Sequence, residues 1–127
     1  MQTRRVVVTG LGAITPIGNT LDAYWDALLR GESGANLITH FDASKFKTQF
    51  ACEVKGFDPN EFIDKKEVRK MDRFTQFAVV ASDEAIKDAG LDLEHEDKDR
   101  IGVIWGAGIG GLRTFQDEVL VFGRGRL

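Results

Sequence analysis

Residues 101–112 read IGVIWGAGIGGL, an apolar run that ends in glycines at positions 106, 108 and 111. The spacing GxGxxG after a buried strand is typical of the turn that holds the pyrophosphate of a dinucleotide. Glycines at the end of a strand also allow backbones to pack closely, or leave space for a ligand that is not a nucleotide. The motif therefore has two interpretations, and the rest of the sequence must separate them.

The dinucleotide interpretation makes a further demand. An acidic residue is needed about 20 positions after the glycines, where it binds the ribose, and the sequence stops at Leu127 before that position can be inspected. The earlier turn at residues 9–18, TGLGAITPIG, has Gly10 and Gly12 but carries Thr15 where the third glycine belongs. The earlier turn fails as a fingerprint, and the later one alone is weak evidence.

Two helices are predicted by apolar residues at helical spacing. The first runs from Leu21 to Leu29, with Asn19 or Thr20 as its N-cap and Gly31 beyond its end. The second covers Leu112 to Phe122, directly after the glycines. Both predictions depend only on local patterns.

Two more helix starts lie between them. The segment 58–61, DPNE, combines an N-cap acceptor, a proline at the first helical position and a glutamate at the third, and predicts a helix to about Met71. Asp72 predicts a second N-cap, for a helix that Gly90 ends. Its apolar stripe consists of Phe74, Phe77, Ala78, Ala81, Ala85 and Ala89. Alanine permits close approach, so we expect this helix to be pressed against a larger body, although alanine also favours helices by itself.

Two strands and one weaker candidate complete the pattern. The runs Val6–Val8 and Ile101–Trp105 predict strands covered on both faces, and 49–54, QFACEV, predicts a short strand near an edge. Residues 34–44 look irregular. The order of strands and helices indicates an α/β protein with parallel strands. Because two long strands make a poor sheet, we expect the sequence to be part of something longer.

Composition narrows the class of protein. The 127 residues fit one small domain, and their net charge of −3 argues against a general nucleic-acid-binding or membrane-surface protein. One cysteine cannot form an internal disulfide, and the start of the chain lacks the apolar run of a signal peptide, which favours the cytoplasm. The longest apolar run, Phe77–Ala81, is far shorter than the roughly 20 residues of a membrane span. No metal-binding pattern and no Ser-His-Asp set is present.

A basic cluster contrasts with this acidic chain. Lys66, Arg69, Lys70 and Arg73 recur at i, i+3, i+4 and i+7, so one continuous helix would place them on a single face. Residues 65–73 contain five basic and two acidic residues, a surplus of three. Such a run is either a solvated face or the docking surface of an acidic partner.

The combination of several segments is more specific than any one of them. RRVVVTGLGAITPIGNT, SGANLITHFDASKF, KKEVRKMDRFTQFAVVASDEAIKDAGL and RIGVIWGAGIGGL together resemble the N-terminal part of bacterial β-ketoacyl-acyl carrier protein synthases, most closely the synthase II branch. The resemblance runs from about Arg4 to Phe122. It implies a thiolase-like fold, two α/β halves layered α-β-α-β-α, of which residues 1–127 resemble most of the first half and none of the second.

The resemblance also implies roles for particular residues. The glycine loop would approach the acyl-chain pocket, with Gly108 and Ile109 at its wall, while the residues alone leave open that Ile109 is ordinary core. Lys66, Arg69 and Lys70 match positions that contact the acidic acyl carrier protein, whereas Arg73 has no such role to carry over. The intact parent would be a homodimeric acyltransferase that needs no cofactor.

The chemistry of the family cannot be placed on this chain. Condensation needs a cysteine thiolate, two histidines and oxyanion-hole donors. Cys52 lies in FACEV, unlike the TACS setting of the family nucleophile, and is expected to be inert core, as are Trp25 and Trp105. His40 and His95 match no catalytic position. We therefore expect no catalytic residue and no activity in these 127 residues alone.

Two other functions remain open at this stage. One is a non-catalytic ketosynthase-like partner of the chain-length-factor type, which keeps the fold and lacks the nucleophile. The other is a dinucleotide-binding oxidoreductase domain built on the glycine loop. A TACS-like segment in further sequence would favour the enzyme, and saturable quenching of Trp105 fluorescence by NAD or NADP would favour the oxidoreductase.

Overall fold

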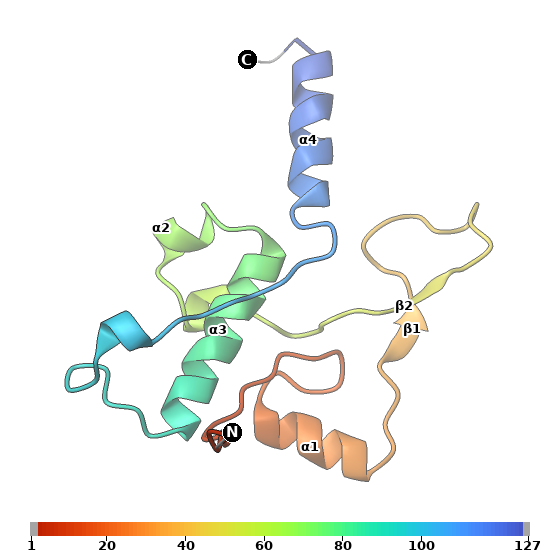
Figure 1. The fold of residues 1–127 in the computed structure, drawn as a ribbon. Helices are drawn as coiled ribbons and strands as arrows, with labels where there is room; N and C mark the ends of the chain where they lie inside the picture. The colour runs from red at the N-terminus through yellow and green to blue at the C-terminus, as the bar shows by residue number, and fades with distance from the viewer. Residues whose placement is uncertain (1–2, 126–127) are drawn as a thin grey trace.

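The computed structural model describes residues 3–125, and its longest helix lies near the centre of the chain (Figure 1). This helix is α3, with α1 near one end of it, while α4 stands away from the other elements. The elements in chain order are α1 (Leu21–Leu29), β1 (Ala35–Leu37), β2 (Phe50–Cys52), η1 (Pro59–Glu61), α2 (Lys65–Val68), α3 (Arg73–Asp88), η2 (Lys98–Arg100) and α4 (Leu112–Gly123). Within residues 3–125, no helix has both the length and the apolar character that crossing a membrane would require.

Three of the four predicted helices are present, as α1, α3 and α4. α1 has the predicted bounds, and the Thr20 hydroxyl caps it by accepting the N–H of Ala23 at 3.2 Å. α3 begins after Asp72 and ends before Gly90, whose φ of +64° lies in the left-handed region that glycine adopts without strain. α4 extends one residue beyond its predicted end.

The single helix predicted from the DPNE start to Met71 is wrong. The Asp58 side chain caps only the short 3-10 turn η1, and the chain then restarts as the four-residue helix α2. Between them, Asp64 has φ −54° and ψ 135°, backbone angles that a helix cannot contain, and its carboxylate caps α2. A second strong N-cap therefore interrupts the predicted helix.

The predicted parallel sheet is not found in the described residues. Their one sheet is antiparallel: β1 pairs with β2 in the register Ala35 to Cys52, Asn36 to Ala51 and Leu37 to Phe50. β2 confirms the weaker strand candidate at 49–54. Its partner β1 lies in a segment that the sequence marked only as irregular.

Neither Val6–Val8 nor Ile101–Trp105 forms a strand. A strand needs a neighbour for its backbone N–H and C=O groups, and in residues 3–125 no backbone–backbone hydrogen bond involves Val6–Val8. Val6 is 89 % exposed and Ile104 is 99 % exposed. The apolar character that predicted these strands is real, but no segment of residues 3–125 lies alongside to pair with them.

The N-terminal loop lies directly on α3. A Cβ atom built on Gly12 would overlap the carbonyl oxygen of Ala81, and one on Gly10 would overlap that of Ala85. Ala81 is buried, as the alanine stripe predicted. The glycines of this loop and the alanines of α3 therefore together allow the two backbones to pack in close contact.

Hydrogen bonds from α3 fix the same loop. The Glu84 carboxylate accepts the N–H of Ala13 and the N–H of Leu21, each at 2.7 Å, and Asp88 accepts that of Leu11 at 2.8 Å. Nearer the start of α3, buried Phe57 packs edge-on against Phe77, with ring centroids 5.1 Å apart. α3 thus organises two segments that precede it in sequence, the N-terminal loop and the residues around Phe57.

Candidate functional site

The basic residues lie in a short segment rather than on one continuous helix. Lys66 belongs to α2, and Arg69 is the C-cap of that helix. Lys70 follows in a turn, where its backbone N–H donates to the carbonyl of Glu67 at 2.9 Å. All three side chains are exposed. We call residues 65–70 the basic segment.

Arg73 does not belong with the others, so the prediction of one face for four basic residues is wrong. Its guanidinium lies 4.9 Å from the ring centroid of Phe57 and 5.1 Å from that of Phe77, and it donates to the carbonyl of Phe57 at 3.1 Å. Asp72, with φ −66° and ψ 158°, separates α2 from α3 and turns the chain. Arg73 is therefore occupied by contacts within the chain.

The three remaining cations differ in their partners. Lys70 forms an ion pair with Glu67 at 2.6 Å, on the same turn. Neither Lys66 nor Arg69 forms an ion pair with any group in residues 3–125. With Lys65, which also forms no ion pair in residues 3–125, three exposed and unpaired cations and one paired cation give the basic segment a local positive charge.

The backbone of the basic segment is held from α3. The side-chain amide of Gln76 donates from Nε2 to the carbonyl of Val68 at 3.3 Å and to that of Met71 at 3.0 Å. Gln76 was not singled out from the sequence. Gln76 lies outside the apolar stripe predicted for α3, so no sequence pattern marked it, and only its burial shows that its amide needs partners.

The glycine loop, residues 106–111, contains two kinds of glycine. Gly108 has open space where a Cβ would lie, and the side chain of Ile109 is 76 % exposed. Gly110 has φ +67°, and a Cβ built on it would lie 3.7 Å from the ring of Phe74. Gly111 lies against the carboxylate of Asp72. In this loop, packing within residues 3–125 therefore requires glycine only after Ile109, at positions 110 and 111. At positions 106 and 108, no atom of these residues lies within 4 Å of an added Cβ.

The loop is attached to the start of α3 by a side-chain contact. The hydroxyl of Thr114, in the first turn of α4, donates to the Asp72 carboxylate. The same carboxylate lies against Gly111, so Asp72 contacts both the end of the loop and the helix that follows it. Asp72 makes no capping hydrogen bond of its own, contrary to the capping role predicted for it.

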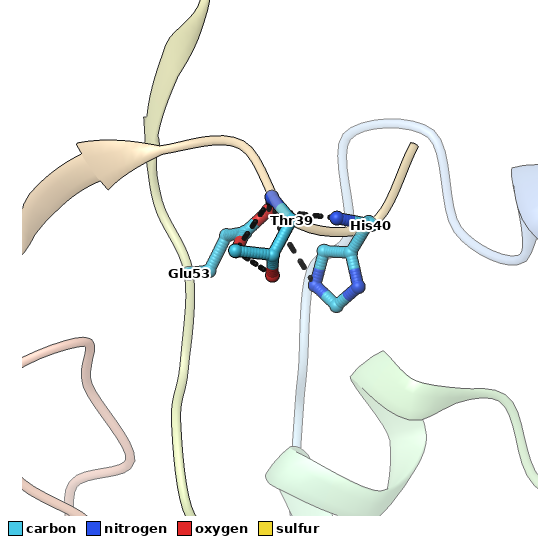
Figure 2. A network of polar contacts seen from close by, with 3 residues as sticks. All are labelled: Thr39, His40 and Glu53. Carbon is cyan, nitrogen blue, oxygen red and sulfur yellow. Dashed lines mark hydrogen bonds and ion pairs between the residues drawn. The ribbon is translucent and has the colours of Figure 1, made fainter. Parts of the chain in front are cut away.

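A third polar group was not foreseen from the sequence (Figure 2). Glu53, 9 % exposed, accepts the hydroxyl of Thr39 at 2.7 Å and the N–H of Thr39 at 3.0 Å, and its carboxylate lies 3.9 Å from Nε2 of His40. The hydrogen bonds from Thr39, first its hydroxyl and then its N–H, lower the pKa of Glu53. Fourteen residues separate Thr39 from Glu53, and no local spacing announces the contact.

The remaining candidates do not assemble a catalytic centre. Cys52 is exposed on β2 rather than inert core, and Trp25 and Trp105 are exposed as well. His95 pairs with Asp92 at 2.7 Å on an exposed turn. In the part of the chain that the structure describes, no cluster of three or more His, Cys, Asp or Glu residues could hold a metal ion.

Comparison with known families decides between the interpretations of the glycine motif. The model described as "Beta-ketoacyl synthase, N-terminal domain" matches residues 3–124. This chain belongs to the beta-ketoacyl synthase family. The dinucleotide interpretation of the glycine loop is therefore set aside, and the resemblance seen in the sequence is confirmed.

Curated relatives agree with the family match. The chain is 53 % identical over 118 residues to 3-oxoacyl-[acyl-carrier-protein] synthase 2 of Synechocystis sp., and 50 % identical over 115 residues to the protein of the same name from Staphylococcus aureus strain COL. These matches cover 93 % and 91 % of this chain. The chain spans about 28 % of the length of each relative.

Solved ketosynthase structures share the fold. The ishigamide ketosynthase/chain length factor matches with a TM-score of 0.73 and 35 % identity, over 94 % of this chain and 30 % of that one. A complex of a type II PKS acyl-carrier protein with its ketosynthase bound to the hexaketide matches with a TM-score of 0.75 and 29 % identity, over 95 % of this chain and 31 % of that one. A beta-ketoacyl synthase from Burkholderia phymatum matches with a TM-score of 0.75 and 28 % identity, over 97 % of this chain and 31 % of that one. The α/β, thiolase-like class inferred from the resemblance is thereby confirmed, even though residues 3–125 pair only two short strands.

Proposed function

We propose that this chain is the N-terminal part of a β-ketoacyl-acyl carrier protein synthase. The intact protein would transfer an acyl group to a cysteine and condense it with malonyl-carrier protein, with loss of carbon dioxide, in fatty acid elongation. Residues 1–127 would be a partial ketosynthase domain with the catalytic residues in further sequence. The intact parent would act in the cytoplasm as a homodimer.

Within that reaction we assign a docking role to Lys66, Arg69 and Lys70. The observation that carries this role is the exposure of all three side chains, with Lys66 and Arg69 unpaired, on a chain whose net charge is −3. A local positive surface on an acidic protein attracts an acidic partner without attracting polyanions in general. An acyl carrier protein bound to a ketosynthase in a structural neighbour is a partner of this kind.

The docking role is tested by charge reversal. Lys66→Glu, Arg69→Glu and Lys70→Glu together should weaken binding of the Synechocystis acyl carrier protein to this chain by at least tenfold at low salt, in an NMR titration of labelled carrier. The control reverses three exposed cations elsewhere, Lys55, Lys98 and Arg100, so that the net charge changes equally. Equal affinities of the two variants would contradict the proposal.

We further propose that Gly108 and Ile109 contribute to the wall of the acyl pocket. Ile109 presents an apolar side chain that residues 3–125 leave uncovered, on a loop whose two last glycines fix its course. The test uses a full-length protein in which residues 3–124 replace the matched segment of the Synechocystis relative. Ile109→Phe should shorten the longest acyl product, and an unchanged product distribution would exclude the role.

The chain-length-factor type remains the second candidate. The structural match to the ishigamide ketosynthase/chain length factor favours it, because that match has the same fold at 35 % identity. The presence of a nucleophilic cysteine in further sequence of the parent decides between the two candidates.

A further inference from the structure

The helix that carries the basic segment is too short to hold its own shape. α2 contains four residues, and a helix of this length is unstable in water because nucleation fixes several residues for one hydrogen bond. The direction in which Lys66 and Arg69 point is therefore set by groups outside α2. The structure shows one such group at each end.

At the start of α2, the anchor is a surface carboxylate. Asp64 accepts the N–H of Lys66 at 2.8 Å, which satisfies one of the free donors of the first turn. Asp64 is exposed, so changing it disturbs no buried contact. This anchor fixes where α2 begins.

At the end of α2, the anchor is a buried amide. Gln76 is 8 % exposed, and its Nε2 donates to the carbonyls of Val68 and Met71, one on either side of Arg69 and Lys70. Its Oε1 accepts no hydrogen bond from residues 3–125. The polar role of Gln76 in these residues is thus donation to backbone carbonyls of the basic segment and of Met71, from the first turn of α3.

We propose that Gln76 is a positioning residue for carrier docking, which fixes the basic segment on α3 so that Lys66, Arg69 and Lys70 face the carrier together. The inference rests on the proposed docking function and adds to it a residue that never touches the partner. A flexible segment with the same charges would still attract an acidic protein, but it would lose orientation entropy when it binds. The position of the cations, and not only their number, would then determine affinity.

The test replaces the donor without changing the charge. Gln76→Met keeps the length and most of the volume of the side chain but cannot donate, so both hydrogen bonds to the basic segment are lost. We expect the dissociation constant of the Synechocystis acyl carrier protein for this chain to rise at least threefold, in the same NMR titration. Helix content from circular dichroism reports whether α3 is still folded.

A double-mutant cycle separates positioning from general stability. In a chain that already carries Lys66→Gln, Arg69→Gln and Lys70→Gln, the three cations assigned to docking are absent, and Gln76→Met should change the dissociation constant by less than twofold. A variant that merely loosened the fold would weaken both backgrounds equally. An equal loss in both backgrounds would overturn the proposal.

A second pair of variants tests the other anchor without touching the interior. Asp64→Asn retains a capping side chain and Asp64→Ala does not, and both remove the same charge. We expect Asp64→Ala to bind the carrier at least twofold more weakly than Asp64→Asn. If charge reversal weakens binding while neither Gln76→Met nor the Asp64 pair has an effect, positioning is wrong and docking stands. If charge reversal has no effect, docking itself is wrong.

Discussion

The carboxylate of Glu84, near the C-terminal end of α3, accepts the backbone N–H of Leu21, the first residue of α1, at 2.7 Å. The other oxygen of the same carboxylate accepts the N–H of Ala13 at 2.7 Å. One side chain therefore fixes both ends of the stretch from Ala13 to Leu21 against a helix more than sixty positions away. This arrangement accounts for an acidic residue on the helix face that the loop covers.

Glu84→Gln should destabilise the chain. An amide has one acceptor oxygen, so one of the two N–H groups would face the amide NH₂ instead and lose its partner. The cost expected from an unsatisfied donor is about 1–3 kcal/mol of unfolding free energy, measured by urea denaturation. Asp83→Asn is the control, because Asp83 makes only an exposed ion pair with Lys87 at 2.5 Å. Equal midpoints for the two variants would contradict this assignment.

Gly12→Ala should destabilise the chain through a clash that no side chain can relieve. The added Cβ would overlap the carbonyl oxygen of Ala81 and lie 2.8 Å from the backbone N of Ala85. Overpacking of this kind costs about 1–3 kcal/mol, read from the shift of the thermal midpoint. Gly108→Ala is the matched control, since nothing lies within 4 Å of its added Cβ. A loss in the control as large as that in Gly12→Ala would show that the loop does not pack as described.

Arg73→Gln should lower stability and leave docking unchanged. The variant removes the cation from the faces of Phe57 and Phe77 and the guanidinium hydrogen bond to the Phe57 carbonyl. We expect a loss of about 1 kcal/mol in unfolding free energy. The dissociation constant for the acyl carrier protein should stay within twofold of the parent value. A larger change in affinity would place Arg73 in the docking surface after all.

Glu53 should make stability depend on pH in the acid range. Its pKa in the folded chain is lowered from 4.5 by the hydrogen bonds of Thr39, so the stabilisation is complete above pH 4.5 and is lost as the pH falls through the lower folded value. Glu53→Gln should therefore be less stable than the parent at pH 7, and the difference should shrink below pH 4.5. Thermal midpoints from pH 7 to pH 3 check this, with Glu96→Gln, an exposed carboxyl, as control. A difference that does not vary with pH would refute the role of Glu53.

Three helices, α1, α3 and α4, could be predicted because their signals are local. The caps at Thr20 and Gly90 and the apolar stripes of α1, α3 and α4 are each contained within one segment. Strands depend on partners that are distant in sequence, and Val6–Val8 and Ile101–Trp105 lack such partners in residues 3–125. The apolar runs alone therefore predicted strands at positions where the described chain forms none.

The candidate site was predicted in part for the same reason. The charge of the basic segment is visible in the sequence, but the break at Asp72 and the diversion of Arg73 to Phe57 depend on packing. Gln76 could not be found by charge or spacing, because its role is set by the two carbonyls that α3 brings within its reach. The motifs in the sequence identified the family, but the hydrogen bonds that hold the basic segment in place were seen only in the structure.

We expect the uncovered valines near the N-terminus to promote association of the molecule with itself as its concentration rises. The side chains of Val6, Val7 and Val8 are exposed. Their backbone N–H and C=O groups form no backbone hydrogen bond with any other segment of residues 3–125. An exposed apolar segment with an unpaired backbone favours pairing with its counterpart in another molecule, so we expect self-association and turbidity of these 127 residues to grow with protein concentration. A lysine at Val7 would oppose that pairing by charge, and dilute, low-temperature handling is the practical remedy for the unaltered chain.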